Sequence, residues 1–142
     1  LNRGGGLLGL HTAAICFDTW DDWSSILGAQ WVWNQTFHPP PKRFQVFASS
    51  HKHPATRNIQ SFEIDDEIYH YLKTIPETTP LLYTNEGEDN TVQELAWAHT
   101  NMKGRVIYSS IAHDEISIAA HGHSKFLRQS ALWCMGERLE EN

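Results

Sequence analysis

A histidine stands at the sharpest turn that this sequence predicts. Residues 4–10 are glycine-rich and then apolar, His11 follows at once, and a helix-like pattern begins after it. In α/β proteins, a short apolar strand of this kind often delivers one reactive side chain to a strand-to-helix turn. The delivered residue is usually a serine or a cysteine. A histidine here predicts proton transfer instead of covalent catalysis.

A second group of polar residues surrounds two predicted loops. His51 and His53 lie in a polar loop that Pro54 restrains, and Asp66 and Glu67 follow a short predicted strand. The carboxylates could orient a histidine or bind sugar hydroxyls. The alternative reading is a solvated acidic turn.

A metal site is an alternative use of the same side chains. His11, His113 and a histidine or carboxylate from the loops could supply three ligands with an open fourth position, as a catalytic zinc requires. No pair has the close spacing of a zinc motif, and nine histidines raise the chance of accidental clusters. We therefore expect no cofactor and no metal, and keep a divalent metal as the alternative.

The tryptophans are expected mainly in the core. Trp20 and Trp23 recur at helical spacing with Ile26 and predict one apolar helix face. Trp31 and Trp33 could instead form a platform on which a sugar ring stacks, although packing is the commoner role of aromatic residues.

Composition narrows the class of protein. The chain has 142 residues, 40% of them hydrophobic and 20% charged, so we expect residues 1–142 to form a single domain. A net charge of −6 argues against a nucleic-acid partner. No apolar run approaches the roughly 20 residues of a membrane helix. Cys16 and Cys134 lie in apolar helical patterns and are expected to be buried free thiols, which fits a cytoplasmic location.

Periodicity predicts an alternation of strands and helices. The expected strands lie at residues 7–10, 44–48, 80–84, 95–99 and 105–111, with a short strand and an irregular turn within 62–71. One helix is expected from Asp18 or Thr19 to about Gly28, and another from Ser124 to about Gly136. His121-Gly122-His123 is expected to be a surface loop before the last helix.

These elements predict the α/β class, with too few helices to cover a sheet. We therefore expect that the chain lacks an N-terminal part of its domain, or that a partner supplies the cover. A homo-oligomer is expected to bury the strand at residues 7–10 or its neighbour, because proteins normally protect an open sheet edge.

Several short motifs resemble, in order and approximate spacing, those of one protein family. They are Gly5-Gly6-Leu7-Leu8-Gly9-Leu10-His11-Thr12-Ala13, Phe37-His38-Pro39, His53-Pro54-Ala55-Thr56, Asp66-Glu67-Ile68-Tyr69, and Lys103-Gly104-Arg105-Val106-Ile107-Tyr108 followed by Ala112-His113. The chain resembles the C-terminal part of a ThuA-like (trehalose utilisation) domain. Ala112 departs from the family pattern, in which a glycine usually precedes the histidine.

The resemblance implies a flavodoxin-like three-layer sandwich of the class I glutamine amidotransferase-like superfamily, without its first strands and helices. In related amidotransferases a cysteine occupies the turn where this chain has His11, and a later histidine corresponds to His113. An imidazole cannot form the thioester that glutamine transfer requires. The resemblance therefore implies carbohydrate utilisation, of trehalose or a related keto-disaccharide, and not amidotransfer.

The resemblance also assigns the candidate residues. The expected catalytic residues are His11, His113 and Glu67, and the expected ligand-binding residues are His38, His53, Asp66 and Tyr69. If the chain is an enzyme, we expect acid–base chemistry of the hydrolase or lyase type on a small carbohydrate. The alternative is a non-catalytic sugar-binding or scaffolding domain that is stable as an oligomer.

Overall fold

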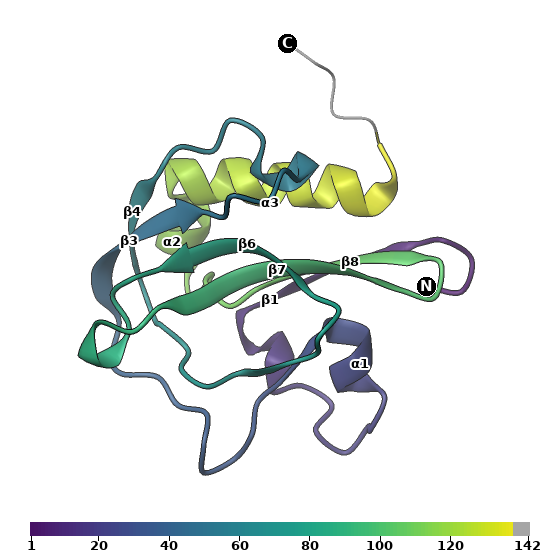
Figure 1. Ribbon diagram of the computed structural model, residues 1–142, viewed down its shortest axis with the longest axis horizontal. Helices are drawn as coiled ribbons and strands as arrows, with labels where there is room; N and C mark the ends of the chain where they lie inside the picture. Colours follow the sequence, from purple (N-terminus) through teal and green to yellow (C-terminus); the bar gives the residue numbers. More distant parts are fainter. Residues whose placement is uncertain (138–142) are drawn as a thin grey trace.

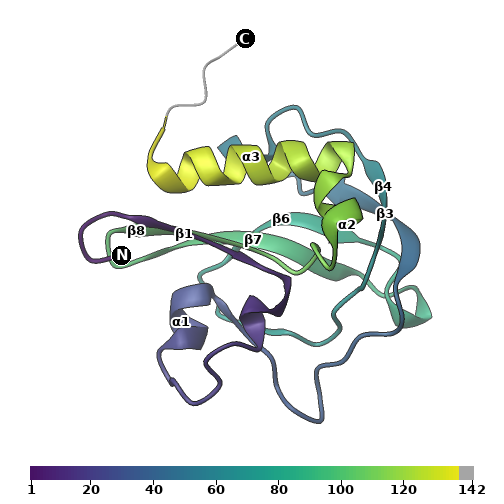
Figure 2. The same ribbon diagram turned by 180° about the vertical axis from the view of Figure 1, so that it is seen from behind.

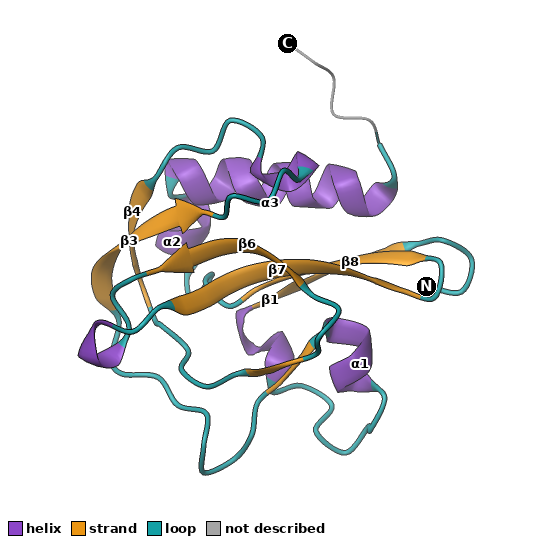
Figure 3. Ribbon diagram, in the orientation of Figure 1, coloured by secondary structure: helices purple, strands orange, loops and turns teal. Residues whose placement is uncertain are grey.

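The computed structural model describes residues 1–137, which build one curled sheet of six strands (Figure 3). The order in the sheet is β1-β8-β7-β6-β3-β4. The strands are β1 Gly6–Leu10, β3 Lys42–Ala48, β4 Phe62–Asp66, β6 Thr79–Thr84, β7 Gln93–Asn101 and β8 Gly104–Ser109. β1 pairs with β8 in parallel, and the other neighbours are antiparallel. Two short strands, β2 Ala29–Gln30 and β5 Lys73–Thr74, form a separate antiparallel pair.

Helices lie on both faces of the sheet (Figures 1 and 2). One face carries α3 His121–Met135, with α2 Glu115–Ala119 and the short 3-10 helix Pro54–Thr56 beside it. The other face carries α1 Trp23–Leu27 and the 3-10 helix His11–Ala14, and a further 3-10 turn spans Glu88–Asn90. This three-layer arrangement confirms the expected α/β class. Within residues 1–137, none of the helices has the length and apolar character needed to cross a membrane.

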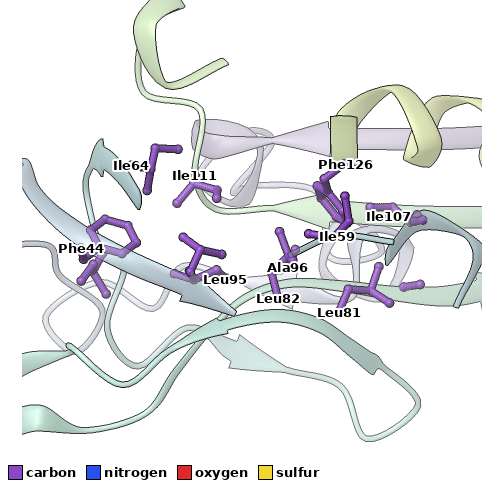
Figure 4. Close-up of a cluster of buried hydrophobic side chains, with 14 of the residues drawn as sticks. Phe44, Ile59, Ile64, Leu81, Leu82, Leu95, Ala96, Ile107, Ile111 and Phe126 are labelled. Atoms are coloured by element: carbon purple, nitrogen blue, oxygen red, sulfur yellow. The ribbon is translucent and has the colours of Figure 1, made fainter. Parts of the chain in front are cut away.

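Strand alternation divides the core between the two faces of the sheet. Ile107 of β8 belongs to the cluster beneath α3, together with Phe126 (Figure 4), whereas the next residue, Tyr108, joins Trp97 and Leu27 on the α1 face. Successive side chains of a strand point to opposite faces, so β7 and β8 connect both layers. Trp97 is fully buried and therefore belongs to the core.

The first helix is shorter than the sequence predicts. Only Trp23–Leu27 is α-helical, and its N-cap Asp22 makes no side-chain capping bond. Residues 18–22 form turns instead, in which the N–H of Trp20 bonds to the carbonyl of Phe17 and the N–H of Trp23 bonds to the carbonyl of Trp20. The prediction that Trp20 is core and that Cys16 is buried is therefore wrong: both are exposed. Cys134 is buried, as expected.

The last helix begins earlier than predicted. It starts at His121, and the hydroxyl of Ser124 donates to the carbonyl of His121 inside the first turn. Gly136 ends it with φ 84°, as expected. The predicted surface loop at His121-Gly122-His123 is wrong, because these residues are helical and His123 is fully buried. Its Nδ1 donates to the carbonyl of Ser117 over 2.8 Å, which satisfies the ring inside the core.

His123 should make the stability of the fold depend on pH. Burial lowers the pKa of His123 below its ordinary value, although the hydrogen bond to Ser117 and the charge of Asp66 act in the opposite direction. The unfolded chain therefore takes up a proton as the pH falls through about 6.5, while the folded chain does so only at lower pH. The free energy of unfolding should fall between pH 7.5 and 5.5. In His123→Asn, which keeps a donor for Ser117, urea titrations should show a shallower decline; an equal slope would contradict this account.

Gly6 should not tolerate a side chain. A Cβ at this position would collide with the backbone carbonyl of Cys134 in α3, whereas a Cβ at Gly5 meets nothing within 4 Å. Gly6→Ala should lower the free energy of unfolding by about 1–3 kcal/mol through overpacking. The matched control Gly5→Ala should leave it unchanged in chemical denaturation, and similar losses in both variants would refute the contact.

Candidate functional site

The parallel pairing of β1 with β8 places His11 beside the segment that follows β8. Leu10 is opposite Ser109 in the register, so His11 and Ser110 leave neighbouring strands at the same edge of the sheet. His11 has φ 44° and is buried, and the hydroxyl of Tyr108 donates to its carbonyl over 2.7 Å. Ligands of α/β sheets usually bind at this carboxyl end of parallel strands.

The hydrogen bond between His11 and Ser110 determines which ring nitrogen of His11 carries the proton. Nδ1 lies 2.8 Å from the carbonyl oxygen of Ser110, which can only accept, so Nδ1 carries the proton. In the neutral ring, Nε2 therefore presents a lone pair. The hydroxyl of Tyr69 lies 2.9 Å from Nε2 and donates to it. Burial, followed by the charges of Glu67 and Asp66, raises the pKa of Tyr69, so the phenol remains a donor at neutral pH.

Three imidazoles surround the carboxylate of Glu67. Oε2 lies 3.4 Å from Nε2 of His11, and Oε1 lies 3.4 Å from Nδ1 of His113 and 3.3 Å from Nδ1 of His38. His113 and His11 also approach each other, with 3.3 Å between Nδ1 and Nε2. Glu67 is 6% exposed, whereas the side chain of His113 is 43% exposed. The cluster is therefore buried at Glu67 and open to solvent at His113.

Asp66 connects the backbone at Glu67 with the backbone at His113. Its Oδ1 accepts from the backbone N–H of Glu67 over 2.6 Å. Its Oδ2 accepts from the N–H groups of Ala112 and His113 over 2.8 and 3.2 Å. Ala112 has φ 128°, a conformation that favours glycine, at the position where the family usually has one. Asp66 is thus placed to position Glu67 and His113 through the backbone.

The structure brings most of the predicted site residues together, with one exception. His11, His38, Glu67, Tyr69 and His113 form the cluster, with Asp66 beneath it. His53 lies elsewhere: its ring is 4.7 Å from that of Trp133 in α3, and its Nδ1 accepts from the N–H of Ala55. Burial lowers the pKa of His53, as expected for a neutral ring that caps a helix.

Sequence reasoning did not identify one contributor to the site, a backbone carbonyl, and it named Trp31 only as part of a sugar-stacking platform. The carbonyl of Ser110 sets the tautomer of His11, and a backbone group leaves no signal in the residue pattern. Trp31 packs edge-on against Tyr69, with 5.1 Å between ring centroids. Within residues 1–137 its indole N–H has no hydrogen-bond partner. The aromatic composition around residue 31 was the available signal for Trp31.

A hollow of about 260 Å³ adjoins the cluster on the side of Trp31. Its walls combine aromatic side chains with polar groups, and the polar part of the lining surface is the larger; they include Ala14, Asp18, Trp20, Asp21, Trp23, Gln30, Trp31 and Trp33. Polar groups beside aromatic rings suit a polar small molecule such as a sugar better than an apolar one. Trp31 links the hollow to the cluster, because its ring contacts both Tyr69 and His38.

The site thus belongs to a three-layer α/β protein with a histidine–glutamate cluster at the end of its parallel strand pair. The ThuA family, described as trehalose utilisation, matches residues 1–134. The chain therefore belongs to the ThuA family. No curated protein matches the sequence.

Two solved structures share the fold at low sequence identity. A ThuA-like protein from Parabacteroides merdae is 15% identical with a TM-score of 0.84, and the match covers 99% of this chain and 64% of that one. A cytoplasmic protein from Salmonella typhimurium LT2 is 14% identical with a TM-score of 0.62, covering 95% and 55%. This chain thus spans less than two thirds of either protein.

The role of Asp66 can be separated from that of the adjacent carboxylate. Asp66→Ala should lower the free energy of unfolding by about 3 kcal/mol, because it leaves buried N–H groups without an acceptor. Asp65 is exposed and pairs with Arg43 on the surface. Asp65→Ala should therefore stay close to wild type in chemical denaturation. Equal stability of the two variants would show that the hydrogen bonds of Asp66 to the backbone do not stabilise the site.

Proposed function

We propose that this chain acts on a carbohydrate, trehalose or a related keto-disaccharide, by acid–base chemistry at the cluster of His11, Glu67 and His113. The observation that carries the proposal is the unprotonated Nε2 of His11, which accepts a hydrogen bond from Tyr69 and lies within 3.4 Å of Glu67 and His113. Membership of a family described as trehalose utilisation supports the substrate class.

The geometry suggests a role for each side chain. Nε2 of His11 is the basic atom, because Nδ1 is committed to the carbonyl of Ser110. His113 is the more exposed imidazole and is the proposed acid that meets the substrate. Glu67 orients both rings. Paired imidazoles suit proton transfer near neutral pH, as hydrolysis, elimination or isomerisation of a sugar requires.

The aromatic hollow is the proposed place for the sugar rings. Indole faces such as that of Trp33 pack against the apolar faces of pyranose rings, while Asp21 and Gln30 offer partners for hydroxyl groups. His38 and Tyr69 lie between this hollow and the catalytic cluster. They are therefore the proposed ligand-binding residues, together with Asp66 acting through the backbone.

A non-catalytic sugar-binding domain is the second candidate function. The observation that favours it is the hollow itself, in which Trp20 and Trp33 are exposed. Under this alternative, a sugar would bind without turnover, and binding would respond to Trp33 rather than to His11.

We further propose that the chain forms a homo-oligomer in the cytoplasm. β1 is an edge strand of the sheet, and its residues Leu7, Leu8 and Leu10 are only half-buried. Pairing of this edge with a second copy would protect it. The Salmonella protein of similar fold is described as cytoplasmic. A monomer at high concentration in sedimentation would contradict the oligomer.

The two candidate functions differ in their response to two substitutions. His11→Asn keeps a donor toward Ser110 and tolerates a positive φ, but it removes the free Nε2. With a 3-keto disaccharide, it should lower kcat at least about a hundredfold while calorimetry still detects binding. Trp33→Ala should weaken binding instead. Unchanged turnover in His11→Asn would refute the catalytic proposal, and saturable binding without turnover in wild type would favour the alternative.

A further inference from the structure

We infer that the cluster of His11, Glu67 and His113 binds a divalent metal ion of the zinc type, with its fourth position open to solvent. The proposed metal site is the same cluster that carries the proposed function. Only its role in sugar chemistry rests on that proposed function. Binding of the ion itself can be measured with no sugar present.

The spacing of the three potential ligand atoms is the first support. Nε2 of His11 lies 3.3 Å from Nδ1 of His113 and 3.4 Å from Oε2 of Glu67, and the other carboxylate oxygen of Glu67, Oε1, lies 3.4 Å from Nδ1 of His113. With one ligand atom taken from each residue, the three atoms lie within 4.8 Å of one another. With metal–ligand bonds of about 2.0–2.1 Å, the edges of a tetrahedron are about 3.3–3.4 Å long, whereas those of an octahedron are about 2.8–3.0 Å. The same distances are longer than good hydrogen bonds, which span about 2.7–3.2 Å. The distance between the two imidazole nitrogens, and the distance from each of them to its nearer carboxylate oxygen, therefore match the edges of a tetrahedral site.

The surrounding hydrogen bonds orient the ligands as a metal site requires. A metal-binding histidine normally donates its other N–H to a carbonyl or carboxylate, and Nδ1 of His11 donates to Ser110. Nδ1 of His38 lies near both the carbonyl of Pro39 and Oε1 of Glu67, so its N–H can hold the carboxylate. Asp66 binds the backbone at Glu67 and His113 and keeps these two ligands in register.

Burial distinguishes a catalytic site from a structural one. Glu67 and His11 are less than 9% exposed, whereas the side chain of His113 opens to solvent. Three protein ligands with an open fourth position are typical of catalytic zinc, and closed four-ligand sites are structural. A cation also compensates the buried charge of Glu67, which has only imidazoles around its carboxylate among the contacts described above.

Tyr69 competes with the ion for the same lone pair. Its hydroxyl donates to Nε2 of His11 in the ion-free arrangement, so it must turn away when Nε2 binds a metal. The hydroxyl is therefore not required as a ligand. Tyr69→Phe removes the competitor and leaves the three ligands intact, so the variant should bind the ion more tightly than wild type.

A bound ion would add two capabilities to the proposed chemistry. It would lower the pKa of a water molecule in the open position to about 7, and it would polarise a sugar carbonyl. In that state the ion would occupy the lone pair of His11, and the hydroxide formed when the bound water loses its proton would serve as the base instead. A keto-disaccharide offers the carbonyl on which such an ion acts.

The test is titration of chelator-treated protein with Zn²⁺ by calorimetry, and with Co²⁺ by visible spectroscopy. We expect one ion per chain and the strong visible absorption of tetrahedral Co²⁺. His113→Ala and Glu67→Gln should each weaken binding at least about tenfold and change the Co²⁺ spectrum. The helix-surface variant His121→Ala should bind as wild type, whereas Tyr69→Phe, which lacks the competing hydroxyl, should bind more tightly.

Several results would overturn the inference. Absence of Zn²⁺ binding in folded wild type would do so, as would unchanged binding in both His113→Ala and Glu67→Gln. If His113→Ala fails to fold, Glu67→Gln and the wild-type Co²⁺ spectrum decide. Turnover of the disaccharide by protein that binds no Zn²⁺ would refute the metal site but not the proposed function. Zinc binding at the cluster without any sugar binding or turnover would refute the proposed function but not the metal site.

Discussion

Asp66 is a buried carboxylate that receives three backbone N–H groups, one from Glu67 and two from a segment 46 residues later in the chain. Hydrogen bonds to a charged acceptor are stronger than those between neutral groups, and a buried carboxylate without them would be costly. This single group therefore determines where the loop after β4 meets the loop after β8. The side chains of Glu67 and His113 face each other because their backbones share it.

The other half of the site depends on sheet geometry. Parallel pairing makes β1 and β8 end at the same edge, and each contributes one histidine just beyond its end. Antiparallel neighbours could not do this, because their carboxyl ends point in opposite directions. Tyr108 and Ser110 then fix the backbone and the ring of His11. The cluster is thus built from elements far apart in sequence, each held by main-chain contacts.

Part of this arrangement could be predicted from the sequence. His11 and His113 follow apolar strands, and strand patterns depend on local alternation of side chains, which a sequence displays directly. Glu67 and Tyr69 came from the resemblance to the ThuA family. The strands, the α/β class and the C-cap at Gly136 were recoverable for similar reasons.

The remainder depends on contacts that no local pattern encodes. Residues 18–22 form turns where the sequence pattern predicts a helix, so Trp20, which would lie on the apolar face of that helix, is exposed. His123 looks like a surface residue, yet a carbonyl of α2 satisfies it in the core. His53 shares a family motif with the site but caps a 3-10 helix beside α3. In each case tertiary structure outweighed residue type.

The backbone of Ala112 is strained, and release of this strain would move the segment that carries His113. Holding a side-chain-bearing residue in a sparsely populated conformation stores roughly 1–3 kcal/mol, and the bond from its N–H to Asp66 opposes the release of that energy. Any event that weakens this bond lets residues 110–113 move toward a more relaxed backbone. Because Ser110 orients His11 and His113 belongs to the same segment, such a movement would change the surroundings of both imidazoles. The integrity of the cluster is thus coupled to the torsion of one alanine that lies outside it.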